Sequence, residues 1–170
     1  LNKEERSFIT LHMLTNILDE VSDINNDFKI TLWVYPHFKH NLFNDIKKKY
    51  KMNIKQQKGS SLCERMNNCL LLESSKHEKT ILIGSDIPSL TKGTIMNAKH
   101  ALLKKDVVIG PSIDGGFYLI GIKGQYKDFI DCMKTMDIQN VKNNIRSHSL
   151  DLELLTELKD IDKPEDLLVI

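Results

Sequence analysis

Hydrophobic residues recur along the chain at spacings typical of helices and of strands. Between residues 4 and 21, apolar side chains from Phe8 to Val21 repeat every three or four positions. This spacing predicts an amphipathic helix with one buried face. The later pattern predicts further helices at 41–50, 60–75 and 89–104.

Strands are predicted where β-branched and aromatic residues cluster. Residues 28–36 form such a run and stop at Pro36, as a buried strand would. Further strands are expected at 53–57, 80–84, 106–110 and 117–122, whereas the weaker signal beyond Lys123 is mainly helical. Alternating strands and helices indicate an α/β sandwich with a largely parallel sheet.

Composition limits the class of protein. The 170 residues fit one domain with its own core, and 41% hydrophobic with 28% charged residues is typical of a globular protein. A net charge of +1 gives no reason to expect a nucleic-acid partner, and no apolar run reaches the roughly 20 residues of a membrane span. The cysteines, Cys63, Cys69 and Cys132, follow no metal-binding spacing, so we expect a reducing cytoplasm.

A lone acid, Asp86, follows the apolar strand predicted at 80–84. Ligands of open α/β sheets bind at the carboxyl ends of the strands, and Gly84 and Ser85 are small enough for a ligand to approach the backbone. Pro88 suits the entry of the following helix. The alternative is that Asp86 merely caps that helix.

A second acid, Asp114, follows another apolar strand and precedes Gly115 and Gly116. Paired glycines permit unusual backbone angles and leave amide groups uncovered, which suits a hydroxylated or phosphorylated ligand. The alternative is a tight hairpin in which Asp114 and the glycines only form the turn.

The end of the chain carries two alternating acids, Asp160 and Asp162. In an extended segment they point to opposite sides, so one could face a cleft. The alternative is the start of a helix at 163–170. With Asp86 and Asp114, these acids suit a divalent metal ion that binds phosphates, because Mg²⁺ is usually held by one or two carboxylates.

The segment 82–123, "LIGSDIPSLTKGTIMNAKHALLKKDVVIGPSIDGGFYLIGIK", strongly resembles the centre of the DUF2064 family, also called selenodomain-associated transferase 1. The resemblance continues through "LNKEERSFITLHMLTNILDEV", "WVYP" and "DIDKPEDL", and so spans nearly the whole chain. It implies a glycosyltransferase-like protein with the GT-A, or nucleotide-diphospho-sugar transferase, fold. That fold is a three-layer α/β/α sandwich with a mostly parallel mixed sheet. The guanylyltransferase for phospholactate and the molybdopterin nucleotidyltransferases are more distantly similar.

The resemblance also implies roles for particular residues. Asp86 would be the metal-binding and catalytic acid, with Asp162 completing a site for Mg²⁺ or Mn²⁺. Asp114, the second catalytic candidate, would form the acceptor- or sugar-side loop with Gly115 and Gly116, and Gly84 and Ser85 would contact the substrate. Arg65 lies in a segment that borders the nucleotide pocket in similar proteins.

The sequence also departs from the family pattern. Ser61 stands where similar proteins carry aspartate, and Cys63 where they carry glycine. The family's first strand and its Lys- and Arg-bearing loop precede the equivalent of Leu1. Residues 1–170 are therefore expected to form a single GT-A-like domain without that strand and loop, and an open strand edge could support a homo-oligomer.

These observations lead to three functional hypotheses. The first is a metal-dependent transferase that uses a nucleotide-activated donor, such as a sugar nucleotide, and an unknown acceptor. The second is a nucleotidyltransferase in which a phosphorylated acceptor attacks a nucleoside triphosphate. The third is a non-catalytic protein that binds a nucleotide or a partner, because a fold alone does not establish activity.

Overall fold

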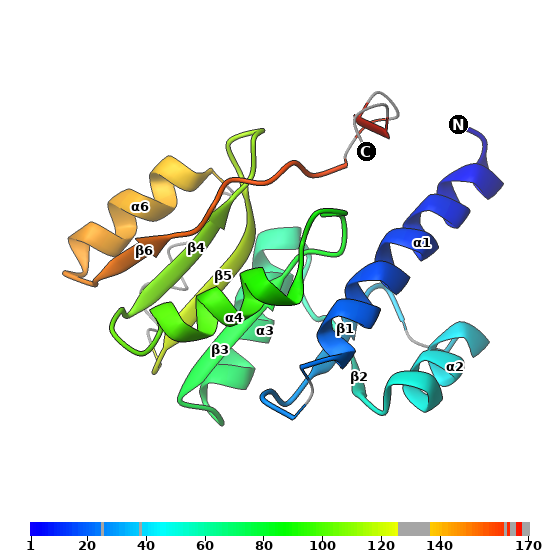
Figure 1. The fold of residues 1–170 in the computed structure, drawn as a ribbon, viewed down its shortest axis with the longest axis horizontal. Helices are drawn as coiled ribbons and strands as arrows, with labels where there is room; N and C mark the ends of the chain where they lie inside the picture. Colours follow the sequence, from blue (N-terminus) through cyan, green and yellow to red (C-terminus); the bar gives the residue numbers. More distant parts are fainter. Residues whose placement is uncertain (25, 38, 126–136, 162, 164–165, 168–170) are drawn as a thin grey trace.

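Helices and strands alternate along the chain, as the sequence predicts (Figure 1). The structure is a computed structural model, and it describes residues 1–170 apart from 25, 38, 126–136, 162, 164–165 and 168–170. The described elements are α1 (Lys3–Ser22), β1 (Thr31–Val34), α2 (Asn41–Tyr50), β2 (Asn53–Gln56), α3 (Leu62–Ser74), β3 (Lys79–Ile83), α4 (Lys92–Ala101), β4 (Val107–Pro111), β5 (Phe117–Lys123), α6 (Ile138–Ser147) and β6 (Leu152–Leu154).

The strands form two sheets. The larger one has the order β3-β5-β4-β6, in which β5 runs antiparallel to β3 and β4 while β6 runs parallel to β4. Three of its four strands therefore point in one direction, and the sheet is mixed. The strands β1 and β2 form a separate parallel pair, with Thr31 opposite Asn53.

Helices cover both faces of this arrangement. One apolar cluster joins α1, α2 and α4 to the sheet and includes Leu18 and Ile95. A second cluster joins α3 and α6 to the sheet and includes Leu70 and Ile145. Burial of these side chains is the main force that holds the layers together. The predicted three-layer α/β/α architecture with a mixed sheet is therefore confirmed.

The first helix packs only through its C-terminal half. Its Ile17, Leu18 and Val21 are buried, whereas the side chain of Phe8 is 72% exposed and that of Leu11 is 39% exposed. Figure 1 shows the N-terminal half of α1 extending beyond the rest of the molecule. The helix predicted from residue 4 to 21 is correct, but the predicted apolar face is buried over only half its length.

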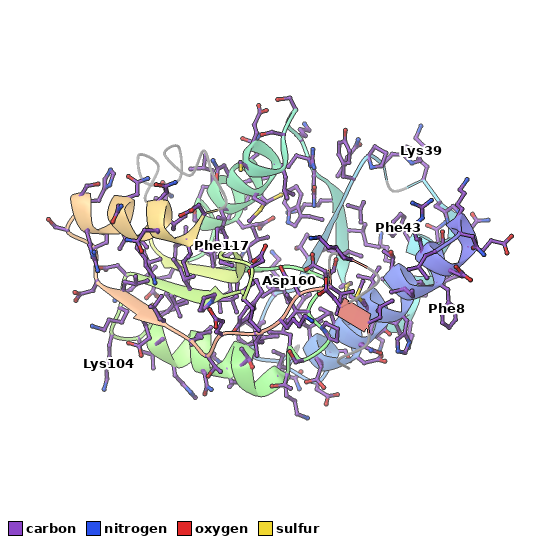
Figure 2. The ribbon with its side chains drawn as sticks, turned by 90° about the horizontal axis from the view of Figure 1, so that it is seen from above. Phe8, Lys39, Phe43, Lys104, Phe117 and Asp160 are labelled. Carbon is purple, nitrogen blue, oxygen red and sulfur yellow. The ribbon has the colours of Figure 1, made fainter. Side chains whose placement is uncertain are left out.

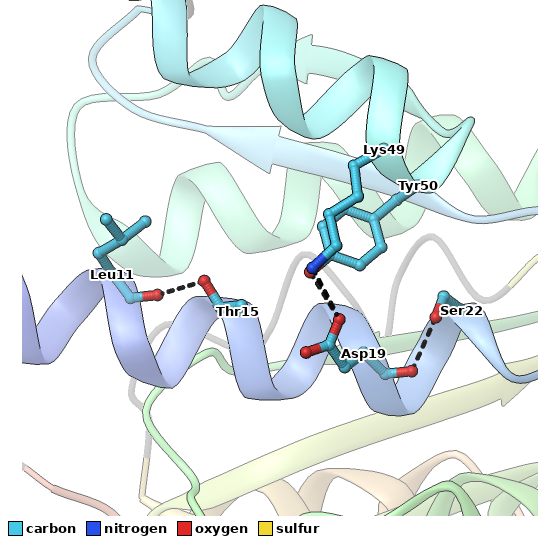
Figure 3. A network of polar contacts seen from close by, with 6 residues as sticks. All are labelled: Leu11, Thr15, Asp19, Ser22, Lys49 and Tyr50. Carbon is cyan, nitrogen blue, oxygen red and sulfur yellow. Dashed lines mark hydrogen bonds and ion pairs between the residues drawn. The ribbon is translucent and has the colours of Figure 1, made fainter.

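A polar network joins α1 to α2 (Figure 3). The Tyr50 hydroxyl donates a hydrogen bond to Asp19 Oδ1 at 2.7 Å, and Lys49 Nζ donates to the Tyr50 oxygen at 2.7 Å. Lys49 also donates to Asp19 Oδ1 at 3.2 Å. Because Tyr50 is buried, this network satisfies a hydroxyl that would otherwise lose its hydrogen bonds to water.

The region beyond Lys123 contains a strand that the sequence pattern does not predict. Helix α6 agrees with the expected helical signal, but Leu152–Leu154 forms β6 at the edge of the larger sheet. The predicted helix at 163–170 falls largely outside the described residues.

Among the helices that the structure describes, none has the length and apolar character needed to cross a membrane.

Candidate functional site

The carboxylate of Asp86 lies just past the end of β3. Pairing between β3 and β5 ends at Gly84, whose N–H donates to the Tyr118 carbonyl at 2.9 Å. The cap of α4 is Thr91, whose hydroxyl accepts a hydrogen bond from the N–H of Thr94. Asp86 is therefore not the cap of this helix, and the capping interpretation is wrong.

Gly84, two residues before Asp86, has a steric role. A Cβ atom on Gly84 would lie 2.7 Å from Asp86 Oδ1, well inside normal contact distance. The Asp86 carboxylate therefore folds back over the backbone of Gly84. Glycine at this position allows the acid to lie against its own strand end.

The Asp114 loop is an ordered turn between β4 and β5. The Ser112 hydroxyl donates to Asp114 Oδ1 at 2.6 Å, and the N–H of Gly116 donates to the same oxygen at 2.9 Å. These bonds lower the pKa of Asp114 from its ordinary value of 3.8, with the Ser112 bond the larger cause. Gly115 has a φ of +92°, in the region that favours glycine. The hairpin interpretation is thus correct for the backbone, and it fixes the orientation of an ionised carboxylate.

The segment after β6 brings a third acid to this edge of the sheet. Ser112 forms a parallel bridge with Leu158, and the N–H of Ile161 donates to the Asp86 carbonyl at 3.0 Å. Figure 2 shows this segment crossing the molecule from β6 to Asp160. Asp162, the residue that the resemblance assigns to the metal, lies outside the described residues. Asp160, two residues earlier, is among the residues that line a cavity at this edge.

These loops surround one large cavity of about 780 Å³. Its size is within the range of small-molecule sites in proteins, which is roughly 300–1,000 Å³. The polar residues that line it at the strand ends are Gly84, Ser85, Asp86, Ser112, Asp114, Gly116 and Asp160. Five of the predicted site residues therefore line the cavity, and two of these, Asp86 and Asp114, are acids. Asp160 lines it too, and so does Ser112, which the sequence argument does not single out.

Arg65 is not among the residues that line this cavity, but it contacts one that does. Its guanidinium carbon is 4.0 Å from the centre of the Tyr35 ring, and its Nε donates to Gln57 Oε1 at 3.1 Å. Gln57 lines the cavity and also donates from Nε2 to the Trp33 carbonyl at 3.1 Å. The sequence argument omits Tyr35 and Gln57, although both directly follow strands whose ends could have indicated them.

The strand-end part of the cavity carries donors suited to a hard cation rather than to zinc. Its strand-end acids offer only oxygen donors, and Mg²⁺ commonly takes one or two carboxylates together with water and phosphate oxygens. Within the described residues, no three His, Cys, Asp or Glu side chains converge closely enough to hold a metal. The described residues therefore show no formed metal site, and the strand-end acids match Mg²⁺ only in the type of donor atom that they offer.

The layer order and the strand-end acids define an α/β protein of the nucleotide-diphospho-sugar transferase fold. A provisionally assigned nucleotide-diphospho-sugar transferase from Desulfovibrio desulfuricans G20 matches with a TM-score of 0.85 and 24% identity, covering 98% of this chain and 74% of that chain. A 4-diphosphocytidyl-2C-methyl-D-erythritol synthase from Anaerococcus prevotii matches at 0.71 with 14% identity, covering 92% and 85%. At these identities the similarity establishes the fold.

The sequence model of the DUF2064 family, described as an uncharacterized protein conserved in bacteria, matches residues 21–138. The chain belongs to this family, which confirms the resemblance seen in the sequence. A CMP:2-keto-3-deoxy-manno-octonic acid synthetase complexed with CTP is a further structural match, with a TM-score of 0.60 and 8% identity, covering 92% of this chain and 84% of that chain. No curated protein matches the sequence.

Proposed function

We propose that this protein is a metal-dependent transferase that acts on a nucleotide-activated donor, most simply a sugar nucleotide. The observation that carries the proposal is the placement of Asp86, Asp114 and Asp160 on one cavity at the ends of the strands. Ligands of α/β sheets bind at this edge. A site with this geometry accelerates transfer chiefly by positioning its substrates and stabilising charge.

A divalent cation is part of the proposal. Asp86 would hold Mg²⁺ or Mn²⁺ together with Asp160 or Asp162. When bound, the ion would neutralise charge on a diphosphate leaving group. The turn around Gly84 supports this assignment, because it leaves the Asp86 carboxylate room to lie across the strand end.

The remaining residues would position the two substrates. Asp114 is held by Ser112 and Gly116 through Oδ1, so its ionised carboxylate can accept hydrogen bonds from acceptor or sugar hydroxyls. Arg65 is held by its contacts with Tyr35 and Gln57, and its guanidinium can donate to a nucleotide phosphate or base. Together they would orient a donor and an acceptor across the cavity.

Calorimetry with a panel of sugar nucleotides, with and without Mn²⁺, tests this proposal. We expect one nucleotide to bind tightly only when the metal is present, and Asp86→Asn to remove that dependence. Glu153→Gln, at an exposed position on β6, is the matched control and should bind like the parent. Equal binding by Asp86→Asn and the parent would contradict the metal assignment.

A second candidate is nucleotidyl transfer from a nucleoside triphosphate to a phosphorylated acceptor. It is favoured by the similarity to a structure complexed with CTP and to a 4-diphosphocytidyl-2C-methyl-D-erythritol synthase. A product assay separates the two reactions. Nucleotidyl transfer releases pyrophosphate from a triphosphate, whereas sugar transfer releases a nucleoside diphosphate from a sugar nucleotide.

A further inference from the structure

The strand β6 forms an outer edge of the larger sheet. Figure 1 shows it outside β4, at the end of the order β3-β5-β4-β6. Ile109 of β4 lies opposite Leu154, and its carbonyl accepts a hydrogen bond from the N–H of Leu155 at 2.8 Å. In a parallel ladder this pattern turns the N–H and C=O groups of Leu152 and Leu154 away from β4. The described part of the chain places no strand against this edge.

Strand β6 lacks two features that commonly protect a free sheet edge. Such edges often carry lysine or proline, which oppose pairing with another chain. Residues 149–158, "SLDLELLTEL", contain neither and are rich in leucine. The side chain of Leu154 is 44% exposed at this edge. An edge of this kind can add a strand from another polypeptide through main-chain hydrogen bonds.

A groove of about 470 Å³ lies beside the edge. One wall is formed by α4 and the turn that follows it, and the other by β6 and the residues just after it. The basic side chains that line the groove are His100, Lys104 and Lys105, and the acid that lines it is Glu153. The groove therefore favours an added strand that carries acids on the side facing α4.

The β6 segment itself has this character. Residues 149–158 contain three acids and no lysine or arginine. Leu152 packs with the apolar cluster of α3 and α6, whereas Leu155 packs with the cluster of α1, α2 and α4. Because side chains alternate along a strand, Glu153 lies on the α4 side of the sheet. A second copy of β6 would thus bring an acid to the side on which the groove carries its basic residues.

We propose that two copies of this protein pair through their β6 strands, antiparallel about a two-fold axis, and join their larger sheets into one. The axis would pass beside Leu154, so that the N–H of Leu154 in each copy donates to the Leu154 carbonyl of the other. Glu153 of each copy would then lie opposite Leu155 of the other and enter its groove. Such an interface is self-complementary, as a two-fold dimer requires.

The charges of β6 favour an axis at Leu154 over one at the preceding residue. An axis at Glu153 would place two carboxylates directly opposite each other, which destabilises a strand pair. An axis at Leu154 instead places two leucines opposite each other. These exposed side chains would cover each other on the α6 side of the sheet.

The pairing would leave both candidate sites open. In an antiparallel pair, the strand ends near Asp86 point in opposite directions in the two copies. The groove beside β6 and the 780 Å³ cavity that Asp86 lines share no described residue. The inference therefore rests on the edge of the sheet and does not depend on the proposed activity.

Analytical ultracentrifugation of the parent protein from about 1 µM to 1 mM tests the proposal. We expect an equilibrium between monomer and dimer. Leu154→Lys and Leu154→Glu should each weaken the dimer about tenfold or more, because like charges then lie opposite each other. An equimolar mixture of the two variants should dimerise more strongly than either alone, since lysine in one copy then faces glutamate in the other.

The matched controls are Leu103→Lys and Leu103→Glu. Leu103 is also an exposed leucine, at 59%, but it does not line the groove. These variants should dimerise like the parent, whether alone or mixed. Thermal unfolding checks that every variant is folded before its association is measured.

Disulfide cross-linking tests the register independently. The Cα atoms of opposed hydrogen-bonded residues in an antiparallel pair are about 5.5 Å apart, within the range that a disulfide spans. With an added thiol oxidant, Leu154→Cys should therefore form linked dimers, whereas Leu103→Cys and the parent should not.

Three results would overturn the proposal. A parent protein that stays monomeric over the whole concentration range would exclude a second copy and leave the edge to a different polypeptide. A dimer that is unchanged by both charged substitutions of Leu154 would place the contact on another surface. Weakening by both substitutions without recovery on mixing, and without cross-linking of Leu154→Cys, would exclude an axis at this residue.

Discussion

The carboxylate of Asp86 lies against Gly84 so closely that a Cβ atom on Gly84 would be 2.7 Å from Asp86 Oδ1. Two residues of one strand end are thus fitted to each other, the glycine by having no side chain and the acid by its orientation. The φ of Gly84 does not require glycine. The need for glycine at this position is therefore set by the Asp86 carboxylate and not by the backbone.

Gly84→Ala should consequently impair binding more than folding. The added methyl group would displace the end of a flexible side chain, so we expect stability to change by no more than about 1 kcal/mol. The proposed metal-dependent nucleotide binding should weaken about tenfold, which corresponds to roughly 1.4 kcal/mol. Thermal unfolding and calorimetry on the same sample measure the two effects.

Gly93→Ala is the matched control. A Cβ atom there would meet only Thr91 Oγ1, at an ordinary distance of 3.5 Å, and the position lies within α4. Because alanine favours helix, this change should stabilise the protein by up to about 1 kcal/mol and leave binding unchanged. Equal effects of the two substitutions on binding would argue against a special role for Gly84.

A second close approach supports the segment after β6 that leads to Asp160. A Cβ atom on Gly110 would lie 2.3 Å from Tyr118 Cζ, and the Tyr118 hydroxyl donates to the Thr156 carbonyl at 2.9 Å. The Tyr118 ring is buried, so it cannot move away easily. Gly110→Ala should therefore destabilise the protein by about 1–3 kcal/mol, measured by urea unfolding.

Tyr118→Phe separates packing from hydrogen bonding at this position. It keeps the ring but leaves the Thr156 carbonyl without its donor, so the expected loss is only about 0.5–1.5 kcal/mol. A loss as large as that of Gly110→Ala would show that the hydrogen bond, and not the ring position, is the main contribution.

The sequence predicts some parts of the site better than others for physical reasons. Asp86 and Asp114 follow apolar strands, and the ends of such strands can be read from local composition. Asp160 reaches the cavity through the pairing of Ser112 with Leu158, a long-range contact that no local pattern encodes. The three-residue strand β6 is missed for the same reason. Phe8 fits the helical period but is exposed, because periodicity identifies a face without showing what covers it.

The lowered pKa of Asp114 predicts a specific response to acid. Because its folded-state pKa lies below the ordinary 3.8, the ionised carboxylate stabilises the native loop above that pH. The contribution should be lost as the pH falls through the folded-state pKa. Ser112→Ala removes the largest cause and should raise the Asp114 pKa toward 3.8, which a carbon-detected NMR titration can measure. An unchanged pKa would assign the shift to the backbone of Gly116.

The contact of Tyr50 with Asp19 should contribute more to stability than the exposed ion pair beside it (Figure 3). Tyr50→Phe removes the hydroxyl that donates to Asp19 and accepts from Lys49, so we expect a loss of about 0.5–1.5 kcal/mol in urea unfolding. Lys49→Met removes a solvent-exposed partner and should cost less, because exposed ion pairs contribute little to stability.

A pH series distinguishes this network from a simple packing effect. Tyr50 is the largest cause of the lowered pKa of Asp19, so its hydrogen bond stabilises the ionised carboxylate. That contribution is present above the ordinary Asp19 pKa of 3.8 and is lost as the pH falls through the lower folded-state value. The stability difference between the parent and Tyr50→Phe should therefore shrink in acid. A difference that stays constant down to pH values below that range would mean that the Tyr50 hydroxyl stabilises the protein independently of the charge on Asp19.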